Sequence, residues 1–344
     1  MTDREGNLIC ISRVPNPNIL VWGKSGYGKT YFSYRKIEEA VAEGESVLII
    51  DYSGSYTRQE MERANFKYSS SVREFNLYQA PFYWISPYEN EKGLASDIAD
   101  TLVSVLAVRS YRQEKLLHEV VTKYMRAHKN IFNITAFISE MEQIFASWKE
   151  CGKATDDFDG LEKLLSRLFQ YKTMSNFFIM KGQITEHCSK KVWLVQLSDF
   201  PESEKKFLAE LIVTFFWKET RHGMKKFNVL ILDEFQFLRL QSGDALISIL
   251  REGRKYDLSV VLSTQFVSHF SKLELESLLQ AGNIVIFKPS SNDMHFSAKM
   301  LGNSNMKQWE KVLSGLEVGE ALLRGHYTIN ERKNICEKPI VLRI

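Results

Sequence analysis

Eight residues near the start of the chain have the types and spacing of a phosphate-binding loop. The segment 23–30 matches G-x-x-x-x-G-K-[ST] at every fixed position. Glycines let the backbone curl so that successive N–H groups point at phosphate oxygens. Lys29 can reach the β- and γ-phosphates, and the Thr30 hydroxyl can ligate Mg²⁺. The nucleotide-binding residues predicted from this loop are Gly23, Lys24, Ser25, Gly26, Tyr27, Gly28, Lys29 and Thr30.

An acidic pair follows a second apolar run and offers the carboxylates that the phosphate-binding loop itself does not contain. Asp233 and Glu234 come directly after Val229–Leu232, a strand-like segment. An acid in this place can hold Mg²⁺ opposite Thr30, and a second acid can polarise the attacking water. We therefore assign Asp233 to magnesium and Glu234 to general base, against the alternative of an ordinary acidic turn. The glutamate favours hydrolysis over transfer to an acceptor hydroxyl, and the sequence has no guanine-reading Asn-Lys-x-Asp motif.

Three further polar residues are candidates for the same reaction. Gln265 follows the strand-like run Ser259–Leu262 and is placed to contact the γ-phosphate or the attacking water. Arg251 and Arg254 lie in a basic cluster just before that run. Such clusters usually form a solvated helix end, but a guanidinium offered to a neighbouring subunit's ATP would stabilise charge on the γ-phosphoryl oxygens. Both interpretations of the arginines stay open.

The elements around these residues indicate an α/β fold. Ile19–Trp22 is an apolar run just before the phosphate loop, and residues 31–42 have a helical pattern just after it, the context that a functional loop requires. The apolar runs lack strict alternation, which is typical of parallel strands buried on both faces, and most are followed by helical stretches. We expect a doubly wound core with a mainly parallel sheet. The predicted strands are Ile19–Trp22, Val47–Ile50, Val192–Leu197, Val229–Leu232, Ser259–Leu262 and Asn283–Phe287.

The pattern changes between residues 91 and 181, where segments of 3.6-residue period replace the strand-like runs. We expect an all-helical insertion at 91–181, within an ATPase core formed by residues 1–90 and 182–344. The insertion could be a lid, an oligomer contact, a partner surface or extra helices packed on the core. Its predicted helices are Leu94–Val108, Ser110–His128, Thr135–Trp148 and Phe158–Tyr171.

Composition places the chain among soluble globular proteins. It has 344 residues, of which 44% are hydrophobic, enough for one large domain or two ordinary ones. The net charge of +3 permits nucleic-acid binding without arguing for it. The polar start and the lack of an apolar run of about 20 residues predict a cytoplasmic protein with no membrane insertion. Scattered cysteines without a C-x-x-C pair argue for reduced thiols; they are Cys10, Cys151, Cys188 and Cys336.

Taken in order, these blocks resemble the HerA/FtsK superfamily of hexameric ATPases, and most closely its HerA-like branch. Matching blocks spread over about residues 19–325, which makes the set more specific than any single motif. The similar blocks are Gly23–Thr30, Ile49–Tyr56, Trp193–Pro201, Leu232–Glu234, Leu250–Tyr256, Val261–Gln265 and Leu316–Ala321.

The resemblance implies a RecA-like P-loop core, a homo-hexameric ring with ATP sites between subunits, and a motor that moves DNA. Lys29, Thr30, Asp233, Glu234 and Gln265 fall on the family's catalytic positions. Arg254 matches the best candidate for an arginine acting in trans, and Arg251 is the second. Asp51 matches an acid near the site, although a strand-end turn acid is the alternative.

One departure from the family keeps other functions open. HerA proteins carry an N-terminal β-barrel, and the residues before Ile19 are too few for one, so the insertion or a partner would replace it. The leading hypothesis is an ATP-driven DNA translocase or helicase. The alternatives are an energising ATPase of a conjugative or secretion apparatus, which the motifs also resemble, and an ATP-dependent scaffold for a nuclease or other effector. Candidate DNA-contacting stretches are 221–226 and 190–191, although either fits a plain solvated turn.

Overall fold

The computed structural model describes residues 1–86, 91–152, 156–181, 191–224, 226–241, 243–302, 305–330 and 335–344. The chain divides into two compact units, and each is treated by itself. Unit 1 comprises residues 1–74, 190–194 and 226–344, and unit 2 comprises residues 75–189 and 195–225. Cys188, Lys190 and Lys225 lie outside the described residues, as do the predicted edges of the insertion at 90 and 182.

A mixed, mainly parallel sheet is the scaffold of the phosphate-binding loop. Within the described residues it has ten strands in the order β1-β15-β13-β12-β3-β11-β10-β4-β9-β5. All six strands predicted from the sequence are present in this sheet. The bounds are β1 Thr2–Asp3, β3 Ile19–Trp22, β4 Val47–Asp51, β5 Val72–Asn76, β9 Val192–Gln196, β10 Val229–Leu232, β11 Ser259–Thr264, β12 Asn283–Phe287, β13 Glu320–Arg324 and β15 Ile340–Arg343.

The centre of the sheet is parallel, and one side of it is antiparallel. Strand β3 pairs in parallel with β11 and with β12, and β10 pairs in parallel with β11 and β4. Beyond β12, strands β13, β15 and β1 pair antiparallel. Since the carboxyl ends of parallel strands share one edge, the segments after β3, β10 and β11 meet there. A separate antiparallel pair joins β2 (Ile9–Ile11) to β14 (Tyr327–Ile329).

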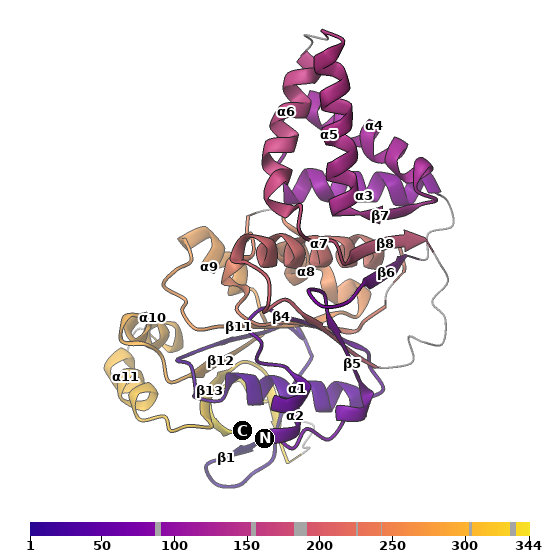
Figure 1. Ribbon diagram of the computed structural model, residues 1–344. Helices are drawn as coiled ribbons and strands as arrows, with labels where there is room; N and C mark the ends of the chain where they lie inside the picture. The colour runs from indigo at the N-terminus through magenta and orange to yellow at the C-terminus, as the bar shows by residue number, and fades with distance from the viewer. Residues whose placement is uncertain are drawn as a thin grey trace. The chain divides into compact units, whose positions relative to one another are not determined.

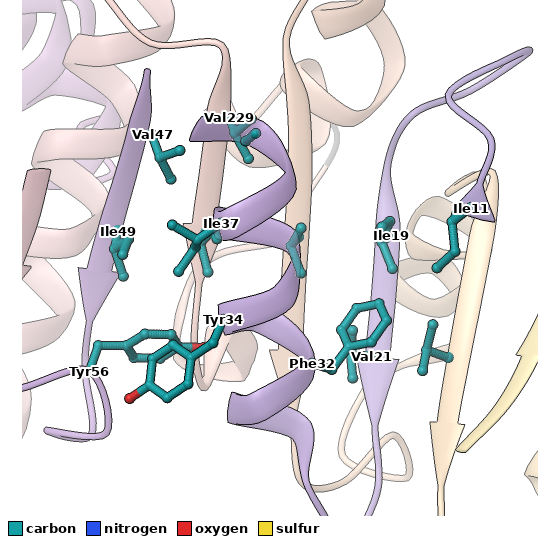
Figure 2. Close-up of a cluster of buried hydrophobic side chains, with 14 of the residues drawn as sticks. Ile11, Ile19, Val21, Phe32, Tyr34, Ile37, Val47, Ile49, Tyr56 and Val229 are labelled. Atoms are coloured by element: carbon teal, nitrogen blue, oxygen red, sulfur yellow. The ribbon is translucent and has the colours of Figure 1, made fainter. Parts of the chain in front are cut away.

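Helix α1 packs its apolar side on one face of this sheet (Figure 2). Phe32 lies beside Ile19 and Val21, while Ile37 lies among the side chains of the strands that carry Val47 and Val229. Phe32 and Ile37 are fully buried, and each buried side chain of this size contributes roughly 1.5–3 kcal/mol. This packing fixes the position of α1, whose first residues, Lys29 and Thr30, are the last two residues of the phosphate-binding loop. The helices of unit 1 are α1 Lys29–Ala42, α2 Arg58–Arg63, α8 Ala245–Glu252, α9 Lys272–Leu278, α10 Ser291–Leu301 and α11 Met306–Ser314.

The opposite face of β3 is tied to α10. Trp22, the last residue of β3, is fully buried, and its indole Nε1 donates to Ser297 Oγ at 3.0 Å. This bond satisfies the indole N–H, which would otherwise be costly to bury. Both faces of the strand before the loop are therefore packed, as the continuous apolar run Ile19–Trp22 predicts.

Unit 2 combines helices with a small sheet of its own. Helix α3 contacts α4 and α7, and α6 contacts α4 and α5. Figure 1 shows α5 and α6 side by side. The bounds are α3 Glu91–Val105, α4 Tyr111–Ala127, α5 Ile134–Glu150, α6 Asp156–Leu168, α7 Glu202–Arg221, β6 Phe82–Ser86, β7 Ile131–Asn133 and β8 Phe177–Lys181. Each predicted helix of the segment 91–181 is present within a few residues.

The expectation that this segment is all-helical is wrong. Strand β8 pairs in parallel with β6 and antiparallel with β7, and both β7 and β8 lie inside 91–181. The alternation of β8 is hidden because both of its faces are apolar: Phe177 and Ile179 are buried, while Phe178 and Met180 are half-buried. Strand β7 leaves too short an apolar pattern in the sequence to be recognised, because α5 begins at the residue directly after it. Among the described residues, no helix combines the length and apolar character that crossing a membrane requires.

Candidate functional site

The phosphate-binding loop needs its glycines for two distinct steric reasons. Gly23 has φ of +144°, and a Cβ there would lie 2.6 Å from Phe287 Cβ and 2.9 Å from the Phe287 carbonyl carbon. Gly28 precedes α1 with φ of +114°, and a Cβ there would approach the Phe287 ring at 3.2 Å. Left-handed backbone favours glycine, and close packing against β12 leaves no room for a side chain. Strand β12 thus holds the loop from one side, and Lys24 N donates to the Lys288 carbonyl at 2.9 Å.

Lys29 is buried at the bottom of this loop. Its ammonium donates to the Gly23 carbonyl at 2.8 Å and to the Lys24 carbonyl at 3.1 Å, so the side chain spans the loop that it follows. Burial lowers the pKa of Lys29, and the charges of Glu234 and Asp233 oppose that shift. The loop and its lysine therefore form a positive, preorganised end of the site, suited to phosphate.

Asp233 lies between two serine hydroxyls at the carboxyl end of β10. Ser263 Oγ donates to its Oδ1 at 2.8 Å, and Ser53 Oγ donates to its Oδ2 at 2.8 Å. Burial raises the pKa of Asp233 to about 6; the two hydroxyl bonds lower it, and the charges of Glu234 and Asp51 raise it. The site thus holds an acid whose ionised form lacks a positive neighbour strong enough to offset its burial.

Asp51 ends β4 and organises the turn that presents Ser53. Its Oδ1 accepts the backbone N–H groups of Ser53, Gly54 and Ser55, and its Oδ2 accepts that of Tyr56. Asp51 is fully buried and does not line the cavity beside the loop. The structure therefore places this predicted nucleotide-site residue behind the site, where it shapes the turn that reaches Asp233.

Glu234 is held by two side-chain amides. Gln265 Nε2 donates to its Oε1 at 2.6 Å, and Gln236 Nε2 donates to its Oε2 at 2.7 Å. The backbone at Glu234 has φ of +52°, an uncommon value for a residue with a side chain, and turns the chain sharply after β10. The structure thus brings Gln265 to Glu234, and it adds Gln236, which the sequence did not single out.

These groups surround one cavity of about 670 Å³, within the range of small-molecule sites. Residues after β3, β4, β10 and β11 form its polar end, where Lys29, Asp233, Glu234 and Gln265 meet. Gly23, Lys24 and Tyr27 belong to the loop but do not line the cavity. The lining residues are Ser25, Gly26, Gly28, Lys29, Thr30, Tyr31, Tyr34, Ser53, Gly54, Ser55, Glu60, Asp233, Glu234, Gln265, Val318, Gly319 and Ile344.

The two predicted arginines lie apart from this cavity. Arg251 is exposed near the end of α8, and Arg254 is exposed just after it; neither lines the site of its own chain. Arg254 Nη1 donates to the Pro15 carbonyl at 2.6 Å. Of the predicted basic stretches, Arg221 and His222 lie exposed at the end of α7, and Lys191 lies just before β9.

Fold and site together define a P-loop nucleoside-triphosphatase with a RecA-like core: a strand, a phosphate-binding loop and a helix, with an acidic pair at the end of a neighbouring parallel strand. A family model described as the central domain of the helicase HerA matches residues 9–216, more than half of the chain. The chain belongs to this family.

Solved structures show the same fold. VirB4 of Thermoanaerobacter pseudethanolicus superposes with a TM-score of 0.68 at 15% identity, over 100% of this chain and 94% of that one. The plasmid coupling protein TrwB, in complex with ADP and Mg²⁺, superposes with a TM-score of 0.64 at 15% identity, over 94% of this chain and 85% of that one. A search of curated protein sequences gave no match.

Proposed function

We propose that this chain is a magnesium-dependent ATPase motor of the HerA type that acts on DNA. The observation that carries the proposal is the convergence of Lys29, Thr30, Asp233, Glu234 and Gln265 on one cavity. Lys29 and the loop N–H groups bind the β- and γ-phosphates, and Glu234 lies at the same end, where the attacking water must be.

The oxygen donors at this end suit Mg²⁺. The Thr30 hydroxyl and the Asp233 carboxylate both line the cavity, and hard oxygen ligands are what this ion prefers. Burial raises the pKa of Asp233 to about 6, and a cation bound beside it would offset the cost of burying the ionised carboxylate. A bound Mg²⁺ would neutralise phosphate charge, while Thr30 and Asp233 hold it beside the loop.

In the proposed hydrolysis, Glu234 accepts a proton from water as the water oxygen bonds to the γ-phosphorus. The bond from that phosphorus to the bridging oxygen breaks, and ADP and phosphate leave. Gln265 contacts the water or the γ-phosphate once it turns from Glu234. Lys29 stabilises the charge that spreads over the phosphoryl oxygens.

We propose further that the chain forms a ring in which Arg254, or Arg251, completes a neighbour's site. Both residues are exposed, and neither lines the cavity of its own chain, which is what an arginine offered to a neighbouring subunit requires. A guanidinium supplied in this way typically raises the rate by about 10³–10⁵-fold.

The test is the ATPase rate with and without duplex DNA over a series of salt concentrations, together with the mass of the assembly. We expect ATP hydrolysis that DNA stimulates, with stimulation weakening as salt rises, because phosphate contacts release counterions. If ATP is hydrolysed but DNA fails to stimulate the rate at every salt concentration, the proposal of a DNA motor is wrong and that of an ATPase stands. A mass equal to one chain under every condition would remove the ring.

A second candidate is the energising ATPase of a conjugative or secretion apparatus. The observation that favours it is the superposition on the solved chain of VirB4, over 94% of that chain. This candidate predicts co-purification with membrane components, whereas the first predicts co-purification with DNA.

A further inference from the structure

We propose that Gln236 is a positioning residue that holds Glu234 by Oε2, so that Oε1 is the oxygen that receives the proton from water. This inference rests on the proposed ATPase function and deepens it. Gln236 lies just after the acidic pair and was not among the candidates that the sequence suggested.

The amide of Gln236 is fixed from both sides. Its Nε2 donates to Glu234 Oε2 at 2.7 Å, and its Oε1 accepts from the Thr264 hydroxyl at 2.7 Å. The Thr264 hydroxyl has one proton, and Gln236 Oε1 lies closer to it than its other acceptor, the Phe266 carbonyl at 3.2 Å. The hydroxyl therefore sets the orientation of the amide, and the amide N–H necessarily points at the glutamate.

The two oxygens of Glu234 face different surroundings. Oε1 accepts from Gln265, which lines the cavity, and Oε2 accepts from Gln236, which does not. A proton arriving from the cavity side meets Oε1, where it must displace the bond from Gln265. The bond from Gln236 to Oε2 is made behind the site and survives the displacement, so it holds the carboxylate aimed at the water.

The three residues also join the two strands of the site. Gln236 follows β10 by a few residues, Thr264 is the last residue of β11, and Gln265 is the next. The end of β11 therefore positions Glu234 in two ways, directly through the bond from Gln265 and indirectly through the bond from Thr264 to Gln236. The bond from Gln265 breaks when that side chain turns to the phosphate. Gln265 acts as the mobile donor, and Gln236 acts as the fixed one.

The test measures kcat, nucleotide affinity and thermal unfolding for Gln236→Ala, Gln236→Glu and Thr264→Val. We expect Gln236→Ala to lower kcat about 10–100-fold, a part of what a general base contributes. Nucleotide affinity should stay within about twofold, because Gln236 does not line the cavity. Gln308→Glu on α11 is the matched control, because it makes the same chemical change as Gln236→Glu at an exposed position.

The pH profile separates positioning from plain structural support. The carboxyl group introduced by Gln236→Glu can donate to Glu234 only when protonated, so the loss in kcat relative to wild type should shrink as pH falls. A loss that is constant with pH would overturn the proposal. If Gln236→Ala unfolds, Thr264→Val remains informative, because it removes one hydroxyl: it should lower kcat in the same direction by a smaller factor, and unchanged kcat would overturn the proposal.

Wild type and Glu234→Gln are measured beside these variants. No hydrolysis by wild type would remove the proposed function itself. Hydrolysis by wild type that Glu234→Gln abolishes, with Gln236→Ala and Thr264→Val at the wild-type kcat, would overturn only the role of Gln236.

Discussion

Ser53 Oγ donates to Asp233 Oδ2 at 2.8 Å, which links the turn after β4 to the acid at the end of β10. The turn is shaped by Asp51, whose carboxylate accepts backbone N–H groups from Ser53 to Tyr56. The acid assigned to magnesium is thus oriented by a hydroxyl whose own position is set by another buried acid.

Glu234→Gln should bind ATP and hydrolyse it poorly. The amide keeps the size of the side chain but cannot accept the proton from water, so kcat should fall by about 10²–10⁴-fold. Steady-state hydrolysis at saturating ATP measures kcat, and titration with a non-hydrolysable ATP analogue measures affinity, which should change little. Turnover at the wild-type rate would show that the general base lies elsewhere.

Gly23→Ala should abolish nucleotide binding. The added Cβ would lie 2.6 Å from Phe287 Cβ and 2.9 Å from its carbonyl oxygen, so β12 and the loop must separate. Gly223→Ala is the control: that glycine also has positive φ, but a Cβ there meets nothing within 4 Å. Calorimetric titration should show lost ATP binding in the first variant and wild-type binding in the second. Equal affinity in both would contradict the packing described for the loop.

Asp233 should make the nucleotide-free protein less stable as pH rises. Burial raises its pKa to about 6 in the folded state, above the ordinary value of 3.8, so between these pH values the folded state binds more protons than the unfolded state. Stability therefore falls as pH rises from about 4 to 6, by an amount on the order of 3 kcal/mol, and the cost remains above pH 6.

Thermal unfolding at pH 5 and pH 7.5 measures this effect. Asp233→Asn should raise the melting temperature more at pH 7.5 than at pH 5, because the amide is never charged. Mg²⁺ added to the wild type should likewise help more at pH 7.5. An equal effect of the substitution at both pH values would place the pKa of Asp233 in its ordinary range.

Mixing two inactive variants should restore activity if Arg254 acts in trans. Arg254→Ala keeps its own Glu234, and Glu234→Gln keeps an arginine to offer, so some interfaces in a mixed ring are complete. We expect ATPase activity to pass through a maximum as the ratio varies. Lys255→Ala, an exposed neighbour, is the control and should be active alone. No recovery at any ratio would exclude Arg254, and Arg251 would be tested in the same way.

Local patterns were enough to predict α1 and six strands of the large sheet, but not β1, β5, β13 or β15. The apolar run Ile19–Trp22, the fixed spacing of the motif and the acids after Val229–Leu232 are all signals within a few residues. The positions of Gln236 and Ser53 were not predictable in this way. Each acts through a hydrogen bond whose partner is known only when β4, β10 and β11 lie side by side.

The small sheet of unit 2 was missed for a related reason. Strand β8 has apolar side chains on both faces, so no alternation marks it, and β7 spans only Ile131–Asn133. Asp51 illustrates a different limit: a buried acid after a strand reads equally as a site residue or as a turn former, and only its backbone partners distinguish the two.

The position of β3 has a consequence for synthesis on the ribosome. Its partners in the sheet are β11 and β12, so Ile19 pairs with Val261 on one side and with Asn283 on the other. A nascent chain that has emerged only as far as α7 contains the whole phosphate-binding loop, yet neither strand that flanks it. The loop can therefore adopt its folded conformation only after β11 and β12 have been synthesised. Nucleotide cannot assist the early steps of folding and can stabilise only the nearly complete unit.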